Sequence, residues 1–431
     1  MNEDLLQFVW QYKYLLHKPL VTTDGKPLQI INPGLLNKGA GPDFFNAQIR
    51  LDNAIWVGNV EIHIKSSDWI KHKHFLDKAY DNVILHVVWE HDTEIINREG
   101  EFIPTLEIKN LLSKEMMVNY QKLMLGNYDI PCSPIFKKPP TIEWTFWIEK
   151  LSIERLEQKH ENLCKHLTNL NGNWEALLYH QTAIAFGQKT NSVPFELLSL
   201  NLPNSILQKY KSDLISIQSL VLGTAGFLNK KMSNEYNQTL QNNFQYLSKK
   251  HEIQCIENSI WKFGKTRPAN FPTLRLFQFA EWVRINPNPF SNFLQCKTVK
   301  DLKKILNQKG NQNVDIGDLH PKGKQSQVER ISIAESFIDS LLINAIIPVL
   351  FAYGKNNQLY WLCNRVQDWT GEISAEENHI IKQWQTLGIC CNKAKETQAL
   401  IQLKNYYCIN KKCLSCAIGN QLLKPEKGAI C

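Results

Sequence analysis

The sequence lacks any long, uninterrupted apolar run. Its most apolar segment, residues 331–353, is broken by Glu335, Ser336, Asp339 and Ser340. The apolar positions between these residues recur at helical spacing, which predicts a buried helix and not a membrane span. A signal peptide is also missing, because MNEDLLQFVWQYKYLLHK is acidic where such peptides are basic and has no small-residue cleavage site. We therefore expect no membrane partner and a cytoplasmic location.

A phosphate-binding loop is absent at the one segment that faintly suggests it. GTAGFLNKK, residues 223–231, lacks the GxxxxGK[ST] spacing that lets backbone amides surround a phosphate. This excludes a nucleotide-binding loop of that type at this segment. Eleven cysteines without an export signal indicate reduced thiols in the cytosol, where some of them can serve as metal ligands.

The composition is that of a folded protein with more than one core. The chain has 431 residues, of which 43% are hydrophobic and twelve are tryptophans, so two or three domains are expected. Lysine and arginine number 49 against 41 acidic residues, a formal net charge of +8. This modest basic excess suits a nucleic-acid partner.

The stretch from residue 41 to 92 contains three runs of alternating apolar and polar residues. The runs cover residues 44–51, 55–65 and 83–89. Asp52-Asn53-Ala54 predicts a hairpin turn between the first two, and residues 67–81 are long enough for a helix before the third. The order hairpin, helix, strand predicts a small α/β core.

Two histidines fall in the predicted helix over residues 67–81. His72 and His74 are two positions apart, so on a helix they would not share a face. We interpret them as solvated polar residues. His86, inside the apolar third run, is expected to be a hydrogen-bonded core histidine.

The acidic residues of this stretch predict a metal site. Asp43 stands at the start of the first strand, and the hairpin can bring it beside Glu61 in the second. His63 and Lys65 follow on the same face as Glu61, at steps of about 6.6 Å. Two carboxylates that close repel each other unless a proton or a divalent cation lies between them. Mg²⁺ or Mn²⁺ is the expected cation.

Pro42-Asp43 followed by Glu61-Ile62-His63 resembles the pattern of the PD-(D/E)XK nuclease superfamily. The resemblance implies that Asp43 and Glu61 bind the metal ion and that the protein cleaves phosphodiesters. It also implies that a first helix packs on the sheet and lends a polar residue to the site, here Gln7 or Gln11. His63 stands where the superfamily has lysine, and an unperturbed histidine is largely neutral at pH 7. His63 would then orient water or bind an ion such as Mn²⁺, and Lys65 would supply the missing charge.

The motifs GPDFFNA, WVGNVEIH, SDW and VILHVVWE, in this order, resemble a bacterial family of proteins of unknown function. This second resemblance covers nearly the whole chain. It implies no established activity.

The predicted fold class is α+β. A small restriction-endonuclease-like mixed sheet with helices is expected in a domain over residues 1–130, before the proline-rich segment 131–140. A helical domain over 141–375 and a C-terminal helical segment over 376–431 follow. Within the helical domain, the basic residues of GKTRPANFPTLRL predict either phosphate contacts or a loop stabilised by arginine packing; they are Lys265, Arg267 and Arg275.

The C-terminal cysteines form a C-x4-C-x2-C cluster of Cys408, Cys413 and Cys416. Three thiolates this close in sequence can bind zinc or an iron–sulfur cluster. A fourth ligand would come from Cys390, Cys391 or Cys431. The alternative is that these cysteines are reduced and packed as small apolar residues.

Three functions remain open from the sequence. The first is a metal-dependent nuclease with Asp43, Glu61, His63 and Lys65 at its site, acting on DNA or RNA. The second is a non-catalytic nucleic-acid-binding or scaffold protein on a nuclease fold that has lost its activity. The third is a hydrolase of another class, with Asp43, Glu61, His63 and His74 around zinc or iron.

Overall fold

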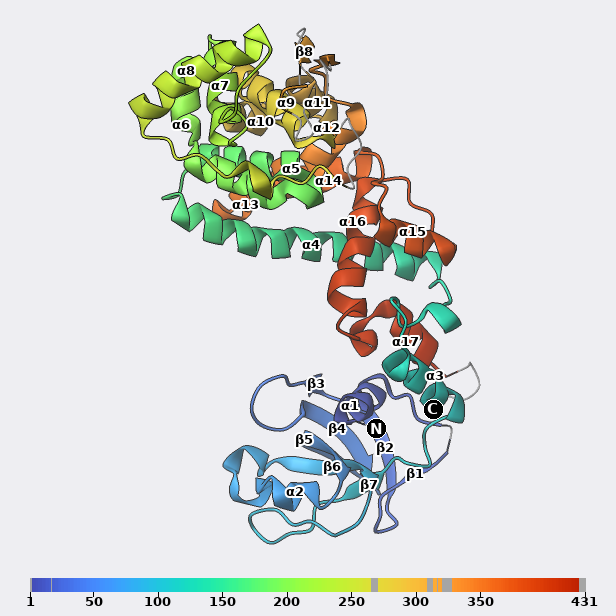
Figure 1. The fold of residues 1–431 in the computed structure, drawn as a ribbon. Coiled ribbons are helices and arrows are strands. Elements are labelled where there is room, and N and C mark those ends of the chain that lie inside the picture. Colours follow the sequence, from blue (N-terminus) through green and yellow to red (C-terminus); the bar gives the residue numbers. More distant parts are fainter. Residues whose placement is uncertain are drawn as a thin grey trace. The chain divides into compact units, whose positions relative to one another are not determined.

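The computed structural model describes residues 2–16, 18–264, 270–307, 313–315, 317–319 and 328–425. As predicted, the fold is α+β, with an N-terminal mixed sheet followed by helices (Figure 1). The chain forms two compact units. Unit 1 combines Met1–Trp147 with Leu403–Cys431, and unit 2 is Ile148–Gln402.

The sheet of unit 1 runs in the order β1-β2-β4-β5-β6-β7, with β3 paired to the outer side of β4. Neighbours from β1 to β5 are antiparallel, whereas β5, β6 and β7 are parallel to one another. The three predicted strands are present within one residue of their expected bounds. The strands are β1 (Leu20–Val21), β2 (Pro27–Asn32), β3 (Leu35–Leu36), β4 (Phe44–Leu51), β5 (Ala54–Lys65), β6 (Val83–Glu90) and β7 (Thr105–Glu107).

Helix α1 (Glu3–Tyr12) covers one face of this sheet and contacts β5. The Asn2 side chain caps it by accepting the backbone N–H of Leu5. Leu5, Leu6 and Val9 recur at helical spacing and are completely buried. Lys13 ends the helix in a left-handed conformation. The helix is thereby fixed with its first turn over the centre of the sheet.

The connection from β5 to β6 differs from the predicted single helix over residues 67–81. It contains a short helix α2 (Asp68–Lys71) and two 3-10 turns, η1 (His74–Leu76) and η2 (Lys78–Tyr80). The break comes at Lys73, whose φ of 60° lies in the left-handed region and cannot continue an α-helix. Asp77 then accepts the N–H of Ala79 and starts the second turn.

The C-terminal segment returns to unit 1. There α17 (Ala417–Leu423) packs on α3 (Lys114–Leu125), and the turn η9 (Cys413–Ser415) contacts α1. The π-helical turn η8 (Leu403–Cys408) leads into this segment, and η3 (Ser133–Ile135) follows α3. The observed units therefore differ from the predicted division at 130, 141 and 376, because residues 376–402 lie in unit 2 and only the last part of the chain joins unit 1.

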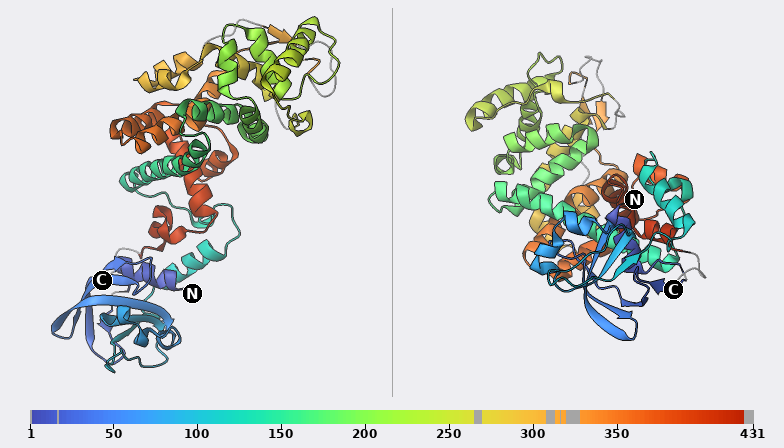
Figure 2. Two further views of the ribbon diagram at one scale, coloured as in Figure 1. Left: turned by 90° about the vertical axis from the view of Figure 1, so that its left-hand side faces the viewer. Right: turned by 90° about the horizontal axis from the view of Figure 1, so that it is seen from below.

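Unit 2 is built almost entirely from helices, among which α7 packs against both α8 and α9 (Figure 2, green to yellow). Its helices begin with α4, which starts in unit 1. Their bounds are α4 (Thr141–Asn169), α5 (Trp174–Asn201), α6 (Asn204–Leu207), η4 (Gln208–Tyr210), α7 (Leu214–Thr224), α8 (Glu235–His251), η5 (Asn258–Ile260), α9 (Pro272–Ile285), α10 (Pro289–Gln295), α11 (Val299–Leu306), α12 (Glu335–Leu341), η7 (Leu342–Ile346), α13 (Ile347–Asn356), α14 (Tyr360–Glu372), α15 (His379–Thr386) and α16 (Ala394–Gln402). The two short strands β8 (Asn313–Asp315) and β9 (Val328–Arg330) pair antiparallel.

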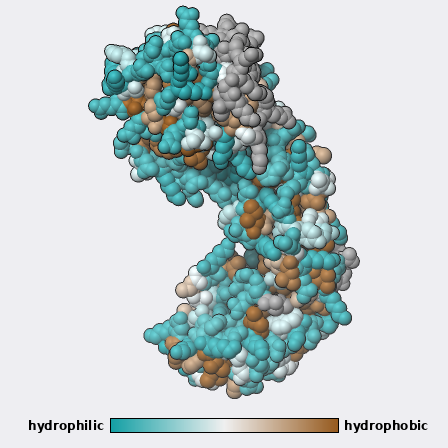
Figure 3. All heavy atoms as spheres, viewed as in Figure 1, coloured by the Kyte–Doolittle hydropathy of each residue, from teal (hydrophilic) through white to brown (hydrophobic). Residues whose placement is uncertain are grey.

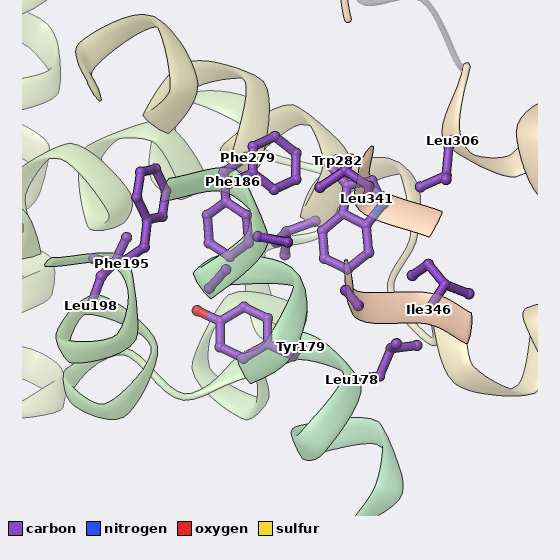
Figure 4. Close-up of a cluster of buried hydrophobic side chains, with 14 of the residues drawn as sticks. Leu178, Tyr179, Phe186, Phe195, Leu198, Phe279, Trp282, Leu306, Leu341 and Ile346 are labelled. Carbon is purple, nitrogen blue, oxygen red and sulfur yellow. The ribbon is translucent and has the colours of Figure 1, made fainter. Parts of the chain in front are cut away.

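The core of unit 2 is centred on aromatic side chains from α5 and α9 (Figure 4). Phe186 and Phe279 are stacked edge to face at 5.3 Å, and Phe279 lies 6.0 Å from Trp282. Each such pair contributes about 0.5–1.5 kcal/mol beyond the burial of its area. These aromatic contacts therefore stabilise the packing of α5 against α9 in unit 2.

One segment among the described residues, Glu335–Asn356, is long and apolar enough to cross a membrane. Of its most apolar window, 83% is buried inside the protein, as in the core helix of a globular domain. The face of unit 2 visible in Figure 3 is mainly hydrophilic. The prediction of a buried helix here agrees with this burial.

Candidate functional site

The β4–β5 hairpin brings Asp43 and Glu61 together. Its turn is tight, with Asp52 left-handed at φ 51° and Leu51 paired to Ala54. The backbone N–H of Asp43 donates to Glu61 Oε2 at 3.1 Å, and the N–H of Ile62 donates to Asp43 Oδ2 at 3.0 Å. Asp43 and Glu61 are therefore neighbours, and each carboxylate accepts a backbone N–H from the segment that carries the other acid.

Helix α1 adds a third acid and an amide to this pair. Gln7 Nε2 donates to Asp43 Oδ1 at 2.9 Å, whereas Gln11, the alternative considered from the sequence, is exposed. Glu3 accepts the N–H of Ile64, and its charge raises the pKa of both Asp43 and Glu61. Sequence reasoning missed Glu3. Its position four residues before Gln7, on the same helix face, was the signal.

Three histidines lie on the other side of Glu61. Glu61 Oε1 is 3.4 Å from His63 Nε2 and 3.5 Å from His74 Nε2. His72 Nδ1 is 3.1 Å from His63 Nε2, and the donor atoms of the three histidines all lie within 4.8 Å of one another. His74 Nε2 is buried and forms no hydrogen bond. The acids and the histidines thus form one continuous group of ligand atoms, with Glu61 between them.

His72 and His74 reach this site because residues 67–81 do not form one helix. The left-handed Lys73 reverses the chain between the two histidines, so both side chains turn toward β5. The His74 ring then stacks on Tyr80, with ring centroids 3.9 Å apart. The interpretation as a solvated residue is therefore wrong for His74, whose Nε2 is buried, whereas His72 is exposed as interpreted and still contacts His63.

His86 on β6 contacts Nδ1 of His63, the ring nitrogen that does not approach Glu61. Its Nε2 lies 2.9 Å from His63 Nδ1, and both rings are buried. The expectation of a hydrogen-bonded core histidine is confirmed. If His63 binds a metal through Nε2, its Nδ1 carries the proton and donates to His86.

When no cation is bound, burial keeps Glu61 protonated and His63 and His74 uncharged at pH 7, whereas Asp43 is ionised. Burial raises the pKa of Glu61 to about 9, with the charge of Asp43 as the next cause, and raises that of Asp43 to about 6. Burial also lowers the pKa of His63 to about 3 and that of His74 to about 4, with neighbouring histidines adding to both effects. Neutral imidazoles are the form that binds metal ions.

The spacing and chemistry of these groups fit a divalent metal ion. Bonds of about 2.0–2.2 Å to nitrogen and oxygen place the ligands of a tetrahedral ion roughly 3.3–3.5 Å apart. Glu61 Oε1 lies at this separation from both His63 Nε2 and His74 Nε2. Within the described part of the chain, no lysine or arginine forms an ion pair with Asp43 or Glu61. A bound cation would satisfy the buried acids and the unpaired His74 nitrogen together.

Lys65 does not join this group. It ends β5 with an exposed side chain, and its backbone N–H donates to Asp68 Oδ2. Its charge acts on Asp92, whereas the electrostatic effects on Asp43 and Glu61 come from burial, from Glu3 and from each other. The structure therefore brings Asp43, Glu61 and His63 together and leaves Lys65 outside.

The sequence predicts either phosphate contacts or arginine packing for three basic residues of unit 2. Arg275 is the one of the three that the structure describes, and it packs in the interior. Arg275 is buried, donates to Gln278 at 2.7 Å and to Asn270 at 2.5 Å, and lies 3.5 Å from the centre of the Phe337 ring. Lys265 and Arg267 lie outside the described residues. Arg275 is thus part of the core.

Comparison with known proteins gives a family and no activity. The family model described as "Protein of unknown function (DUF2851)" matches residues 3–379, which include every acid and histidine of the site. No curated protein matches the chain, and no solved structure does.

Proposed function

Because the chain belongs to the DUF2851 family, whose description names no activity, we propose from the site geometry that unit 1 is a metal-dependent phosphodiester hydrolase acting on nucleic acid. The observation that carries this proposal is the position of Glu61. Its Oε2 accepts the backbone N–H of Asp43, and its Oε1 lies at metal-ligand spacing from the Nε2 atoms of His63 and His74.

The residues of the chain have distinct roles in this proposal. Asp43 and Glu61 would hold Mg²⁺ or Mn²⁺, with His63 and His74 completing the ligand set. The ion would lower the pKa of a water molecule and stabilise the charge that develops on the phosphate. Gln7 fixes the orientation of Asp43 through its hydrogen bond. His72, the exposed member of the histidine group, faces the solvent from which a substrate approaches.

The order of elements supports the nuclease resemblance. A first helix contacts the sheet, a hairpin carries one acid on each strand, and a crossover leads to a parallel strand. His63 in the lysine position changes the site's charge, since the imidazole is neutral where an ammonium would be cationic. Imidazole ligands favour Mn²⁺ over Mg²⁺. The nucleic-acid substrate follows from the resemblance and from the net charge of +8.

A transition-metal hydrolase of another class is the second candidate. The 3.4 and 3.5 Å separations from Glu61 to His63 and His74 favour it, because zinc and iron prefer imidazole nitrogen. It differs from the first candidate in its metal and in its substrate. The two are therefore separable by experiment.

The test is cleavage of single-stranded DNA, double-stranded DNA and RNA by the full chain in Mg²⁺, Mn²⁺ or Zn²⁺. We expect cleavage in Mn²⁺ and a loss of at least about 100-fold in Glu61→Gln and in Asp43→Asn. The matched control is Glu107→Gln, because Glu107 lies on the same sheet and accepts the His91 N–H away from the site.

Two results would count against the nuclease. Cleavage that is unchanged in Glu61→Gln would remove the assigned role. Nucleic-acid binding without cleavage in any metal, unaffected by Glu61→Gln, would indicate the non-catalytic binding or scaffold protein.

We also propose a cytoplasmic location. No disulfide forms among the described residues, and the thiols of the C-terminal cluster are buried. Reduced cysteines are typical of the cytosol. Microscopy of a tagged full-length chain, with fractionation as a second measurement, would test this location.

A further inference from the structure

A fourth cysteine lies beside the C-terminal cluster in unit 1. Cys408 ends η8, Cys413 begins η9 and Cys416 immediately precedes α17. Cys132, from the segment between α3 and η3, is buried together with these three. Cys132 lies in the proline-rich segment 131–140, far from the C-terminal cluster in sequence.

Hydrogen bonds hold the two segments together around these cysteines. Lys411 Nζ donates to the carbonyl of Met124 at 2.7 Å, and Asn119 Nδ2 donates to the carbonyl of Leu422 at 3.0 Å. Lys404 Nζ donates to the carbonyl of Asp129, three residues before Cys132. The C-terminal segment is therefore fixed against the end of α3 and the loop that carries Cys132.

The four sulfur atoms lie within one another's electric fields. Negative charge on Cys416 or Cys413 raises the pKa of Cys132, after burial as the main cause. Charge on Cys416, Cys132 and Cys413 likewise raises the pKa of Cys408. These effects agree with the position of the four buried cysteines on adjoining segments, which the hydrogen bonds of Lys404, Lys411 and Asn119 hold together. Hydrogen bonds among the four buried thiols would stabilise the fold only weakly, because a thiol is a weak hydrogen-bond donor and a weak acceptor.

The backbone around Cys416 is arranged to receive a thiolate. The N–H groups of Ile418 and Gly419 donate to its sulfur. Gly419 also packs so closely that a Cβ at this position would lie 2.0 Å from the Cys413 carbonyl oxygen. N–H donors aimed at sulfur stabilise negative charge there, which is needed when cysteine binds a metal.

We propose that Cys132, Cys408, Cys413 and Cys416 form a four-thiolate metal centre that ties the C-terminal segment to the sheet unit. A cation would let all four thiols lose their protons and would replace their mutual repulsion with shared attraction. Cys390 and Cys391, considered from the sequence as the fourth ligand, belong to unit 2, and Cys431 lies outside the described residues.

The spacing of the sulfurs favours an iron–sulfur cluster over one zinc ion. Among the described residues, the groups of donor atoms within 4.8 Å of one another do not include these cysteines. One zinc ion, with bonds of about 2.3 Å, would hold its four sulfurs roughly 3.8 Å apart. In a four-iron cluster each cysteine binds a different iron, so the cysteine sulfurs lie further apart than around one zinc ion.

The test is metal analysis of the full chain purified without oxygen. We expect about four irons and four acid-labile sulfides per chain, with visible absorption. Cys132→Ala and Cys416→Ala should each lose more than nine-tenths of this content. The matched control is Cys296→Ala, because Cys296 is also a buried cysteine but lies in unit 2. Glu61→Gln should retain the content, which separates this centre from the proposed hydrolase site.

The outcomes are decisive in both directions. About one zinc per chain that is lost in Cys132→Ala and kept in Glu61→Gln would support the four-thiolate centre and identify its ion as zinc. A wild-type chain without iron or zinc, even after incubation with ferrous iron and sulfide or with zinc, would overturn the proposal whether or not the variants fold. Full metal content in a folded Cys132→Ala chain would overturn the assignment of Cys132.

Discussion

At the scale of single residues, Glu61 connects two sets of ligand atoms that the sequence presents separately. The acid pair could be predicted from the order of strands, because residues near the open end of a hairpin face each other. His74 was named only in the third function, from the histidine content, because its approach to Glu61 depends on one left-handed residue, Lys73. Glu3 had a signal, its place one turn before Gln7 on the same helix face, but which helix turn meets the sheet is decided by packing.

The pKa of Glu61 leads to a pH dependence of stability in the metal-free protein. Burial raises this pKa to about 9, above the value of about 4.3 in an unfolded chain. The folded state therefore keeps a proton that the unfolded state has lost, and the stability contributed by this group falls as pH rises toward 9. We expect the free energy of unfolding of unit 1 to fall by roughly 1 kcal/mol per pH unit from pH 7 to 9. Amide hydrogen exchange of β5 in chelator would measure it.

Asp43, His63 and His74, the other ionisable groups of the site, change their protonation little between pH 7 and 9. Asp43, with a pKa of about 6, has already ionised at pH 7, and the stability contributed by neutral His63 and His74 is complete above pH 6.5. Glu61→Gln carries no titrating proton and should remove the decline between pH 7 and 8; at higher pH the buried thiols of unit 1, whose pKa values burial also raises, add a decline of their own. An equal decline in both proteins between pH 7 and 8 would show that another group causes it.

His86 is expected to act on the metal through His63. His86→Phe keeps a ring of similar size but removes the 2.9 Å contact that fixes the tautomer of His63. Loss of such a supporting hydrogen bond typically weakens metal binding 10–100-fold. Titration calorimetry with Mn²⁺ would measure the change, with circular dichroism as the check on folding. Unchanged affinity in a folded variant would contradict the role of His86.

At the scale of elements, β5 is the strand on which the site depends, and Gly58 sets its fit to β6. A Cβ at Gly58 would lie 2.4 Å from Ile84 Cγ2 and 2.7 Å from the Asn82 carbonyl oxygen. Gly58→Ala must therefore push β5 and β6 apart, which we expect to cost about 1–3 kcal/mol. Gly39→Ala is the control, because its nearest contact is at an ordinary 3.4 Å. Thermal unfolding of the two variants would show the difference, and equal melting temperatures would contradict it.

The strands were predictable and the crossover was not. Alternating burial along β4 follows directly from the alternation of apolar residues in the sequence. Residues 67–81 have the length of a helix, but their conformation is set by Trp69 and Tyr80, which pack with Val83 beneath the sheet. Local pattern therefore specified the sheet, and tertiary packing specified the segment that supplies two of the three histidines.

At the scale of the whole molecule, unit 1 is assembled from both ends of the chain. Tyr14 OH donates to Asn420 Oδ1 at 2.8 Å, and Ile418 and Leu423 are buried in the same unit. Sequence reasoning placed the cysteine cluster in a separate C-terminal segment, because nothing in local composition reveals which earlier residues a returning chain will contact. The partner of the cluster, Cys132, was missed for that reason.

Removal of residues 403–431 should therefore weaken the sheet unit and spare the helical one. The deletion takes away the Asn119–Leu422 and Tyr14–Asn420 hydrogen bonds and uncovers apolar surface on α1 and α3. We expect amide protection of β4 to β6 to fall at least tenfold while protection of α5 and α9 stays unchanged. Hydrogen exchange with mass spectrometry would compare the two. Equal protection of the sheet in both chains would show that unit 1 folds without its C-terminal part.

Because unit 1 combines an early and a late part of the chain, its two parts are synthesised at different times. On the ribosome, Ile148–Gln402 emerges between the two parts of unit 1, a delay on the order of tens of seconds at about 5–20 residues per second. Unit 2 can therefore fold during translation, whereas unit 1 cannot bury all of its apolar surface until residues 403–431 have emerged. Asp43 and Glu61 therefore emerge early, but the unit that holds them gains its last helix, α17, only after unit 2 has emerged.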